Sequence, residues 1–393
     1  MRLVHLSDLH LGYRQYQRLT PTGINQREWD VANTFRRAID RVIDIAPELI
    51  VVSGDVFHSS RPTNAAILHA FRQFMRLRTS LPETRIVVIA GDHDTPRTTE
   101  SGSIMGLFEQ IGLHVAASEP RQFHFAELET SVLAIPDGHD IARMPNDAAK
   151  HNVLVMHCDV DDVVPRYYAE LDRATVKLSR GDLAASRWSY VALGHYHSHQ
   201  RVADNAFYAG SLDFTSLNVW FDLDEHPRKG FVVFDLETGE HRFEAVEESR
   251  AFIDLAPIDA RDLSVVEVNA AIQSIVERVK GGIDDKVVRL VVRDIPRAVA
   301  RELDHRLIRE YKRRALSFHL DTRRPEITRR DAAGAPVRRP SVAEFVRQKL
   351  VERPLPPEIE RERVVELGLK YLNDADAFPS AAATTAIVAE PEG

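Results

Sequence analysis

The sequence contains a single cysteine, Cys158, among its 393 residues. One thiol cannot form a disulfide within the chain, and it excludes zinc sites built on pairs of cysteines. Long hydrophobic runs are also missing. No uninterrupted apolar stretch approaches the roughly 20 residues that span a bilayer, and the first residues lack the charged and then apolar pattern of a secretory signal. We therefore expect a soluble, cytoplasmic protein.

An excess of positive charge is absent as well, since the net charge is −8. Such a balance ordinarily argues against a nucleic-acid partner. The charge is unevenly distributed, however, because residues 301–350 hold 14 Lys or Arg against 7 Asp or Glu. An acidic body with one basic segment is compatible with contact to a phosphate backbone, and a solvated basic helix with a linker explains the same composition equally well.

A chain of 393 residues is too long for one ordinary core and suggests two or three domains. Apolar periodicity predicts an α/β protein. Short continuous apolar runs followed by turn signals indicate buried strands at 2–6, 49–53, 85–90, 152–156 and 190–193. Helical spacing is found at 29–45 and 62–78, and also at 103–111. Further along, we expect strands at 123–135, 207–211, 230–235, 286–293 and 317–321, a loop at 212–229, and helices at 264–280 and 296–316.

Acidic or imidazole side chains follow each of the five buried strands. Asp8 and His10 come just after the first strand, and residues two apart on an extended chain point to the same side. Ligands of α/β sheets bind at the carboxyl ends of the strands. The candidates at these ends are Asp8, His10, Asp55, Asp92, His157, His195 and His197.

This set of side chains predicts a centre for two metal ions. If Asp55 is shared, the seven residues supply four ligands to each ion. Carboxylate and imidazole without thiolate suit manganese, iron or zinc. Two ions about 3.5 to 4 Å apart can hold a hydroxide and neutralise phosphate oxygens. A lone Asp-x-His pair would be weak support, but the ordered set after five strands predicts hydrolysis of a phosphoester.

The same motifs resemble a known superfamily. Asp8-x-His10, Gly54-Asp55, Gly91-Asp92-His93-Asp94, His157 and Gly194-His195-Tyr196-His197 resemble the calcineurin-like metallophosphoesterases. Within that superfamily, GDVFHSSRP at 54–62, the tyrosine and serine of YAGS at 208–211, and KGF at 229–231 resemble the SbcD-type nuclease subunit of the double-strand-break repair complex. The resemblance implies a four-layer α/β/β/α sandwich and a DNA exonuclease and endonuclease.

The resemblance also implies roles for individual residues. One ion would take Asp8, His10, Asp55 and His197, and the other Asp55, Asp92, His157 and His195, with two Mn²⁺ as the usual occupants. His58 and His93 would lie beside the scissile phosphate, where an imidazole can stabilise developing charge or protonate the departing 3′ oxygen. Phosphoprotein phosphatases of the superfamily have a further Asp and Arg after the second motif, and their absence here favours a nuclease.

Domain boundaries follow from composition and from the resemblance. We expect a phosphoesterase domain at 1–250, a DNA-capping α/β domain at 251–322, a linker at 323–340, a helical segment at 341–373 that docks on the coiled coil of an ABC-type ATPase subunit (SbcC-type), and a disordered tail at 374–393. The helix at 62–78 would form a homodimer, although ordinary packing on the sheet explains its apolar surface as well. Candidates for DNA contact are Arg61, Arg97, Arg313, Arg314, Arg323 and Arg324.

One position departs from the family pattern. The third motif normally has asparagine where this chain has Asp92. A carboxylate can still bind metal, but it raises the number of carboxylates in the shell from two to three, so we expect tighter metal retention and a less acidic bound water. A nearby arginine such as Arg97 could offset the added negative charge.

Two other functions remain open from the sequence. The first is a phosphodiesterase that acts on small molecules, which the basic segment argues against. The second is a DNA-binding scaffold with an impaired site, for which Asp92 is the only support. The interpretation we carry forward is a manganese-dependent DNA nuclease, associated with the nucleoid when it acts on DNA.

Overall fold

The computed structural model describes residues 1–96, 102–141, 145–146, 148–161, 163, 176–216, 218–325, 347–351 and 361–367. The chain divides into two compact units, one formed by Met1–Val163 with Ala174–Pro325 and one by Val164–Arg173 with Glu326–Gly393. In the second unit the described residues, 347–351 and 361–367, are helical. Most of the expected linker, most of the docking segment and the whole expected tail lie outside the described residues. No helix among the described residues is long and apolar enough to cross a membrane.

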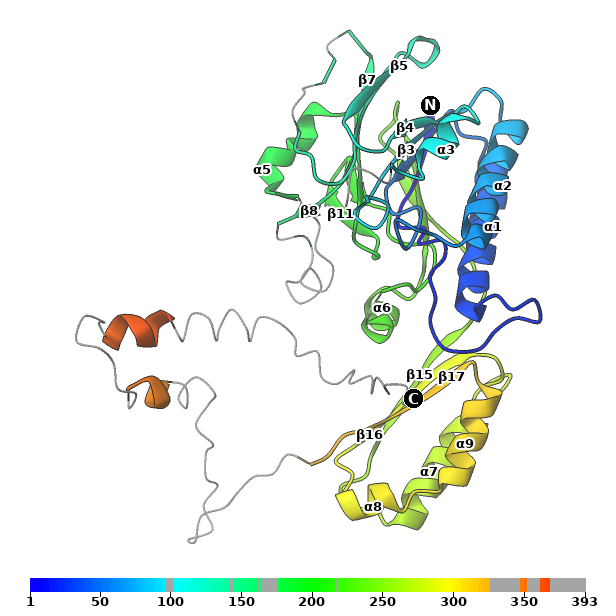
Figure 1. The fold of residues 1–393 in the computed structure, drawn as a ribbon, viewed down its shortest axis with the longest axis vertical. Helices are drawn as coiled ribbons and strands as arrows, with labels where there is room; N and C mark the ends of the chain where they lie inside the picture. The colour runs from blue at the N-terminus through cyan, green and yellow to red at the C-terminus, as the bar shows by residue number, and fades with distance from the viewer. Residues whose placement is uncertain are drawn as a thin grey trace, which may run out of the picture. The chain divides into compact units, whose positions relative to one another are not determined.

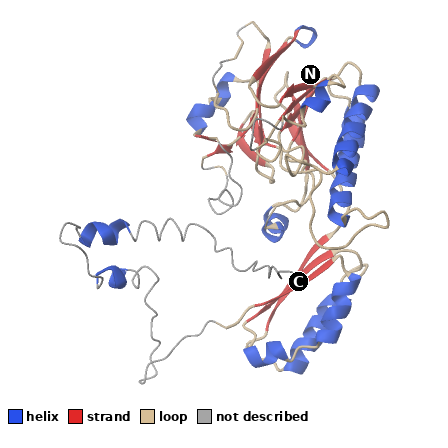
Figure 2. Cartoon of the chain, viewed as in Figure 1, coloured by secondary structure: helices blue, strands red, loops and turns tan. Residues whose placement is uncertain are grey.

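The first unit contains two six-stranded sheets and helices, which confirms the expected α/β class (Figures 1 and 2). The first sheet has the order β14-β13-β1-β2-β3-β4, and β1 to β4 are parallel. Its central strands are apolar on both faces because both faces are covered. The bounds are β1 Arg2–Leu6, β2 Leu49–Ser53, β3 Arg85–Ile89, β4 His114–Ala116, β13 Gly230–Asp235 and β14 His241–Ala245.

Three helices pack on one face of the first sheet. They are α1 (Gln26–Ile45), α2 (Asn64–Ser80) and the short α3 (Gly106–Glu109). Helix α1 begins earlier than expected because the Asn25 side chain accepts hydrogen bonds from the backbone N–H groups of Arg27 and Glu28. Helix α2 begins after Thr63, whose hydroxyl accepts the N–H of Ala66. The buried faces of these helices and of the sheet form one hydrophobic core.

The second sheet packs against the other face of the first sheet through a second core. Its order is β11-β12-β10-β7-β6-β5, and β6, β7, β10 and β12 are parallel. The bounds are β5 Arg121–Phe125, β6 Thr130–Ile135, β7 His151–His157, β10 Tyr190–Gly194, β11 Gln200–Ala203 and β12 Ala206–Tyr208. Shorter elements are η2 Ala126–Leu128, β8 Asp159–Val160, β9 Lys177–Leu178, α5 Arg180–Leu183 and η3 Ala185–Arg187.

A smaller parallel sheet, β15-β16-β17, follows in the chain and has its own core. Helices α7 and α9 lie along one face of this sheet (Figure 1). Helix α7 begins with a capping box formed by Ser264 and Glu267. The bounds are β15 Phe252–Asp259, α7 Val265–Glu277, β16 Val287–Arg293, α8 Arg297–Arg301, α9 His305–Arg314 and β17 Ser317–Thr322.

Several sequence expectations about elements were wrong or incomplete. The expected loop at 212–229 contains a helix, α6 (Val219–Glu225). The expected long helix at 296–316 is two helices, α8 and α9, because the Asp304 side chain caps a new helix by accepting the N–H groups of Arg306 and Leu307. Strand β15 was not foreseen at all.

Candidate metal centre

The carboxyl ends of five strands, β1, β2 and β3 of the first sheet and β7 and β10 of the second, bring the seven predicted ligands together. The histidines and carboxylates gather in groups whose ligand atoms all lie within 4.8 Å of one another. The site thus lies where two sheets meet, and neither sheet alone could build it. The three-residue groups are Asp8, His10 and His197; Asp92, His157 and His195; Asp8, Asp55 and His157; Asp55, Asp92 and His93; and His10, His58 and His93.

The first half of the centre is formed by Asp8, His10 and His197, which are all buried. The Nε2 atoms of His10 and His197 lie 2.8 Å apart, so the two rings turn the same atom toward one point. The His10 Nε2 is also 3.6 Å from Oδ2 of Asp55. The Asp8 carboxylate accepts the backbone N–H of His195 at 3.1 Å, which ties the two sheets together beside the ligands.

The second half is formed by Asp92, His157 and His195. The His157 Nε2 lies 2.9 Å from Oδ1 of Asp92, and the His195 Nδ1 lies 3.6 Å from the same oxygen. The other nitrogen of His157, Nδ1, is 2.8 Å from the carbonyl oxygen of Ser53. A carbonyl only accepts, so Nδ1 carries a proton. Although burial acts in the other direction, Asp55 and the hydrogen bond with Asp92 raise the pKa of His157 well above its usual value, so in the metal-free centre Nε2 is protonated too and would lose that proton to bind a cation.

Asp55 lies between the two halves. Its Oδ2 is 3.6 Å from Nε2 of His10 and 3.7 Å from Nε2 of His157. Within the described residues, the ion-pair partners of Asp55 and Asp92 are histidines. Three carboxylates and four imidazoles with this placement fit divalent cations, which bind oxygen and imidazole nitrogen together.

Four of the seven side chains come from residues with left-handed backbone conformations. Asp8, His10 and Asp55 have φ values of 49°, 45° and 50°, and His195 has a φ of 110°. Strand β1 ends at Leu6, as expected, but the assumption of an extended chain from Asp8 to His10 was wrong, because the backbone at both residues is left-handed. Left-handed conformations are costly for residues other than glycine and cluster at functional sites.

Asp94 organises the loops that carry the ligands. Its buried carboxylate accepts the backbone N–H groups of Val56 at 2.9 Å, Phe57 at 2.8 Å and Gly91 at 3.1 Å. The loop after β2 is thereby fixed to the loop after β3. Burial raises the pKa of Asp94 to about 6, against the opposing effect of these three hydrogen bonds. The sequence motif contained Asp94 but gave no indication of this role.

His58 and His93 lie beside the first half of the centre. Their rings are stacked at a centroid distance of 5.1 Å, and both contact the ring of His10. The His93 Nδ1 lies 2.9 Å from the backbone carbonyl of His58, so this nitrogen carries the proton. The His93 side chain is 22% exposed, which lets a substrate reach the ring.

In the metal-free centre, burial and neighbouring titratable groups shift the pKa values of several ligands. Burial, followed by the neighbouring His197, lowers the pKa of His10 well below its usual value. Burial raises the pKa of Asp55, and the carboxylates of Asp92 and Asp8 raise it further. Although burial acts in the other direction, hydrogen bonds with His157 and His195 hold the pKa of Asp92 well below its usual range. His10 is therefore neutral and Asp92 ionised at neutral pH, the forms that bind cations.

The described arginines among the candidates for DNA contact belong to different elements. Arg61 is an exposed residue of the loop between β2 and α2, and Arg97 lies outside the described residues. Arg313 and Arg314 end helix α9, where Arg314 pairs with Asp284. Arg323 pairs with Asp321 just after β17, and Arg324 is exposed.

Sequence reasoning missed the residues that surround His197. Thr215 Oγ1 lies 3.3 Å from Nδ1 of His197, and Lys229 donates to its backbone carbonyl at 2.8 Å. Lys229 and Ser211 belong to segments that resembled the nuclease family, but no role was assigned to either. Nothing in the sequence indicated a role for Thr215 or Asp222, because isolated polar residues in an expected loop are usually solvated.

A comparison with family models matches residues 1–199 to the calcineurin-like phosphoesterases. Similar curated proteins are named DNA double-strand break repair protein Mre11. The one from Methanococcus maripaludis is 29% identical over 254 residues, which cover 60% of this chain and 63% of that protein. The one from Methanocaldococcus jannaschii is 26% identical over 65% of this chain and 69% of its own length.

The Methanopyrus kandleri relative is 26% identical over 75% of this chain and 65% of its own length. In two of these three relatives the chain therefore spans slightly less than two thirds of the protein. The family match covers half of the chain, and it includes all five strand ends that carry the cluster. The chain belongs to the calcineurin-like phosphoesterase family.

Proposed function

We propose that this protein is a manganese-dependent DNA nuclease that hydrolyses phosphodiesters with two metal ions. The observation that carries the proposal is the position of Asp55 between two groups of histidine and carboxylate ligands. Asp8, His10, Asp55 and His197 would hold one ion, and Asp55, Asp92, His157 and His195 the other. The names of the relatives support DNA as the substrate.

The two ions would supply an attacking hydroxide and neutralise the phosphate oxygens. The chain itself holds and orients the proton donors. The carbonyl of His58 fixes the proton of His93 on Nδ1, so Nε2 is the atom that can face a substrate. When Nε2 is protonated as well, His93 can donate to the departing 3′ oxygen, while the stacked His58 lies beside the same phosphate.

We also propose that the protein works as a subunit of an SbcCD-type repair complex. The helical residues 347–351 and 361–367 would belong to the segment that contacts the coiled coil of an ABC-type ATPase. The small sheet, with α7 to α9, would be the DNA-capping domain at 251–322. Exposed arginines such as Arg313 and Arg324 would contribute to contact with the phosphate backbone.

The proposal is tested by incubating the full chain with Mn²⁺ and either linear double-stranded DNA or bis-p-nitrophenyl phosphate. We expect cleavage of DNA by the wild type and a loss of about 10²- to 10⁴-fold in the His93→Ala variant, which should still bind Mn²⁺. His124→Ala is the matched control, because His124 is an exposed histidine of β5.

The same assay separates the alternatives. Hydrolysis of the small ester without cleavage of DNA would favour a phosphodiesterase that acts on small molecules. If neither substrate is cleaved although Mn²⁺ is bound, the protein is a scaffold with an impaired site. Equal activity of His93→Ala and the wild type would remove His93 from the mechanism.

A further inference from the structure

The backbone carbonyl of His197 is surrounded by hydrogen-bond donors. The N–H of Ser211 donates to this oxygen at 3.1 Å, and the ammonium group of Lys229 donates to it at 2.8 Å. The hydroxyl of Ser211 lies 3.2 Å from the same oxygen and 2.8 Å from the carbonyl of Asp213, so its single proton is shared between them. The carbonyl is thus held by Lys229, the residue before β13, on one side and by the loop after β12 on the other.

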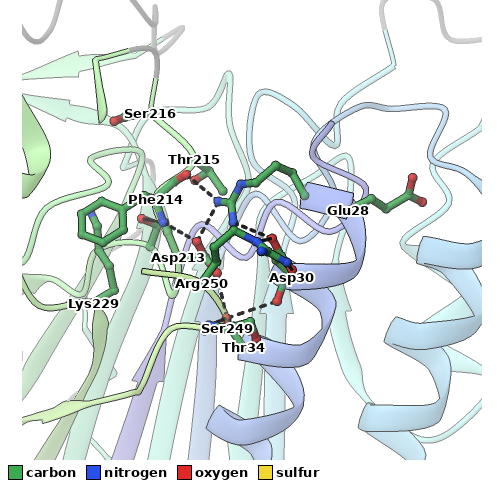
Figure 3. Close-up of polar contacts among 12 residues, drawn as sticks. Glu28, Asp30, Thr34, Asp213, Phe214, Thr215, Ser216, Lys229, Ser249 and Arg250 are labelled. Atoms are coloured by element: carbon green, nitrogen blue, oxygen red, sulfur yellow. Dashed lines mark hydrogen bonds and ion pairs between the residues drawn. The ribbon is translucent and has the colours of Figure 1, made fainter. Parts of the chain in front are cut away.

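Lys229 is a fully enclosed charge, with a side chain only 2% exposed. It forms an ion pair with Asp222 at 2.7 Å, and the Asp222 side chain is 0% exposed. Its ammonium group also lies 5.0 Å from the centroid of the Phe214 ring. Both side chains are labelled in Figure 3. Asp222 in turn accepts hydrogen bonds from the hydroxyls of Ser198 at 2.9 Å and Ser216 at 3.0 Å.

The ring of His197 is held by the same loop. Thr215 Oγ1 lies 3.3 Å from Nδ1, while Nε2 faces His10 at 2.8 Å. The loop is itself clamped from the other side, since the buried Arg27 of α1 donates to Asp213 at 2.8 Å and to the carbonyl of Phe214 at 2.9 Å. The backbone of His197 is therefore held by the buried charge of Lys229, and its ring is held by a loop that the buried charge of Arg27 fixes in turn.

We propose that Lys229 and Asp222, together with Thr215, are positioning residues for the metal ligand His197. The inference rests on the proposed function only in requiring that metal ions bind the cluster. Lys229 and Asp222 would act by holding the peptide of His197 and Ser198, and Thr215 by fixing the rotation of the ring. None of the three would touch substrate or metal.

Stability alone is a poor explanation for this pair. Removing two charges from water costs several kcal/mol per ion, and replacing a buried pair by apolar residues of similar volume is often neutral or stabilising. A core that needed only packing could use methionine and leucine at these two positions. The pair instead contacts the carbonyl of the ligand His197, the neighbouring Ser198, and Ser216, which follows Thr215 in the chain. Partners that orient metal ligands in this way affect metal affinity by about 10- to 100-fold.

The test uses the full chain with the paired substitution Lys229→Met and Asp222→Leu, which removes both charges at similar volume. Binding of Mn²⁺ is measured by calorimetric titration and by electron paramagnetic resonance, without DNA. The His197→Ala and His195→Ala variants identify which of the two sites is weakened. The control is Arg314→Met with Asp284→Leu, an ion pair at the end of α9 that lies outside the cluster.

We expect the paired variant to keep the Tm of the wild type to within a few degrees. The site that His197→Ala weakens should lose about 10- to 100-fold in affinity, while the site that His195→Ala weakens stays unchanged. The control pair should leave both sites unchanged. If both sites keep wild-type affinity in the folded paired variant, the inference is overturned.

If the paired variant does not fold, Thr215→Val decides instead, because it keeps the shape of the side chain and removes only the oxygen beside His197 Nδ1. The same single site must then weaken, and unchanged affinity overturns the inference. A wild type that binds no Mn²⁺ at all would refute both the inference and the proposed function. A wild type that binds Mn²⁺ at two sites but cleaves no DNA would refute only the proposed function.

Discussion

At the scale of single residues, Asp92 sets the charge of the centre. It is ionised, contacts two histidines, and adds a third carboxylate to the shell. In Asp92→Asn the Mn²⁺ affinity should fall by at least about tenfold, because one negative charge is removed at the same shape. The bound water should become more acidic, so activity should move to lower pH.

Calorimetric titration with Mn²⁺ and a pH profile of DNA cleavage check both parts of this prediction. Asp94→Asn is not a suitable control, since Asp94 organises the same loops. Asp140→Asn serves better, as an exposed aspartate of the loop after β6. An Asp92→Asn variant with unchanged affinity and an unchanged pH profile would contradict the proposed effect of the third carboxylate.

His5 is a buried histidine that links the two sheets. Its Nδ1 lies 3.0 Å from the hydroxyl of Tyr190 in β10, and its Nε2 lies 2.8 Å from the hydroxyl of Ser53 in β2. Burial lowers the pKa of His5 from 6.5 to about 3. Since the unfolded chain binds this proton more readily, the stabilising contribution of neutral His5 is complete above pH 6.5 and is lost as the pH falls toward 3.

The His5→Gln variant tests this link to pH. One proton corresponds to about 1.4 kcal/mol per pH unit, so the free energy of unfolding should fall less steeply by up to that amount between pH 6 and pH 4 than in the wild type. Urea unfolding of both proteins at several pH values gives the two slopes. Parallel slopes would show that His5 titrates alike in the folded and unfolded states.

At the scale of elements, the two sheets approach each other closely at Gly194, the last residue of β10. A Cβ atom there would lie 1.8 Å from the carbonyl oxygen of Ser53 and 2.7 Å from Nδ1 of His157. Gly194→Ala should therefore force β10 away from β2, with a cost of about 1 to 3 kcal/mol or more in stability and a loss of Mn²⁺ affinity.

Thermal unfolding and Mn²⁺ titration measure these two effects. The matched control is Gly106→Ala in α3, since a Cβ there would meet no heavy atom within 4 Å. If Gly194→Ala and Gly106→Ala have the same Tm and the same metal affinity, the close approach of the sheets is not required for the centre.

Elements that are defined by local patterns were predictable, and those defined by tertiary contacts were not. Strands β1 and β2 are continuous apolar runs and were found at their observed bounds. Strand β15 escaped notice because exposed and buried residues alternate irregularly and Pro257 interrupts it. The shift in register against β16 lies between Leu255 and Ile258, where the proline is tolerated.

The same distinction holds for the centre. The identities of its seven side chains followed from motifs placed after strands, and the structure brings them together. The division of the five strands between two sheets and the left-handed turns at Asp8 and His10 did not follow, since both depend on residues distant in sequence. Helix α6 was missed because it is short. It also buries a charged residue, Asp222, which is possible because Asp222 forms an ion pair with Lys229.

At the scale of the whole molecule, helix α2 presents apolar side chains that the first sheet does not cover. Leu68 is 53% exposed and Met75 is 38% exposed, so this face is where the homodimer implied by the resemblance would form. If α2 forms that interface, Leu68→Glu should raise the dissociation constant of the dimer at least about tenfold, because a charge would be buried there.

Analytical ultracentrifugation over a range of concentrations measures this constant. Val266→Glu is the matched control, since Val266 is 76% exposed on α7 and should leave association unchanged. A wild type that remains monomeric, or equal association of both variants, would show that α2 packs only within its own chain.

Because the ligands come from strands of two different sheets, bound cations would act as cross-links between the sheets. Ligand binding to the folded state alone stabilises it, by about 2.7 kcal/mol at a concentration one hundred times the dissociation constant. Any fluctuation that separates the layers would first have to release the ions. A chelating buffer would then have two effects. It would abolish activity, and it would also weaken the packing of the two sheets against each other.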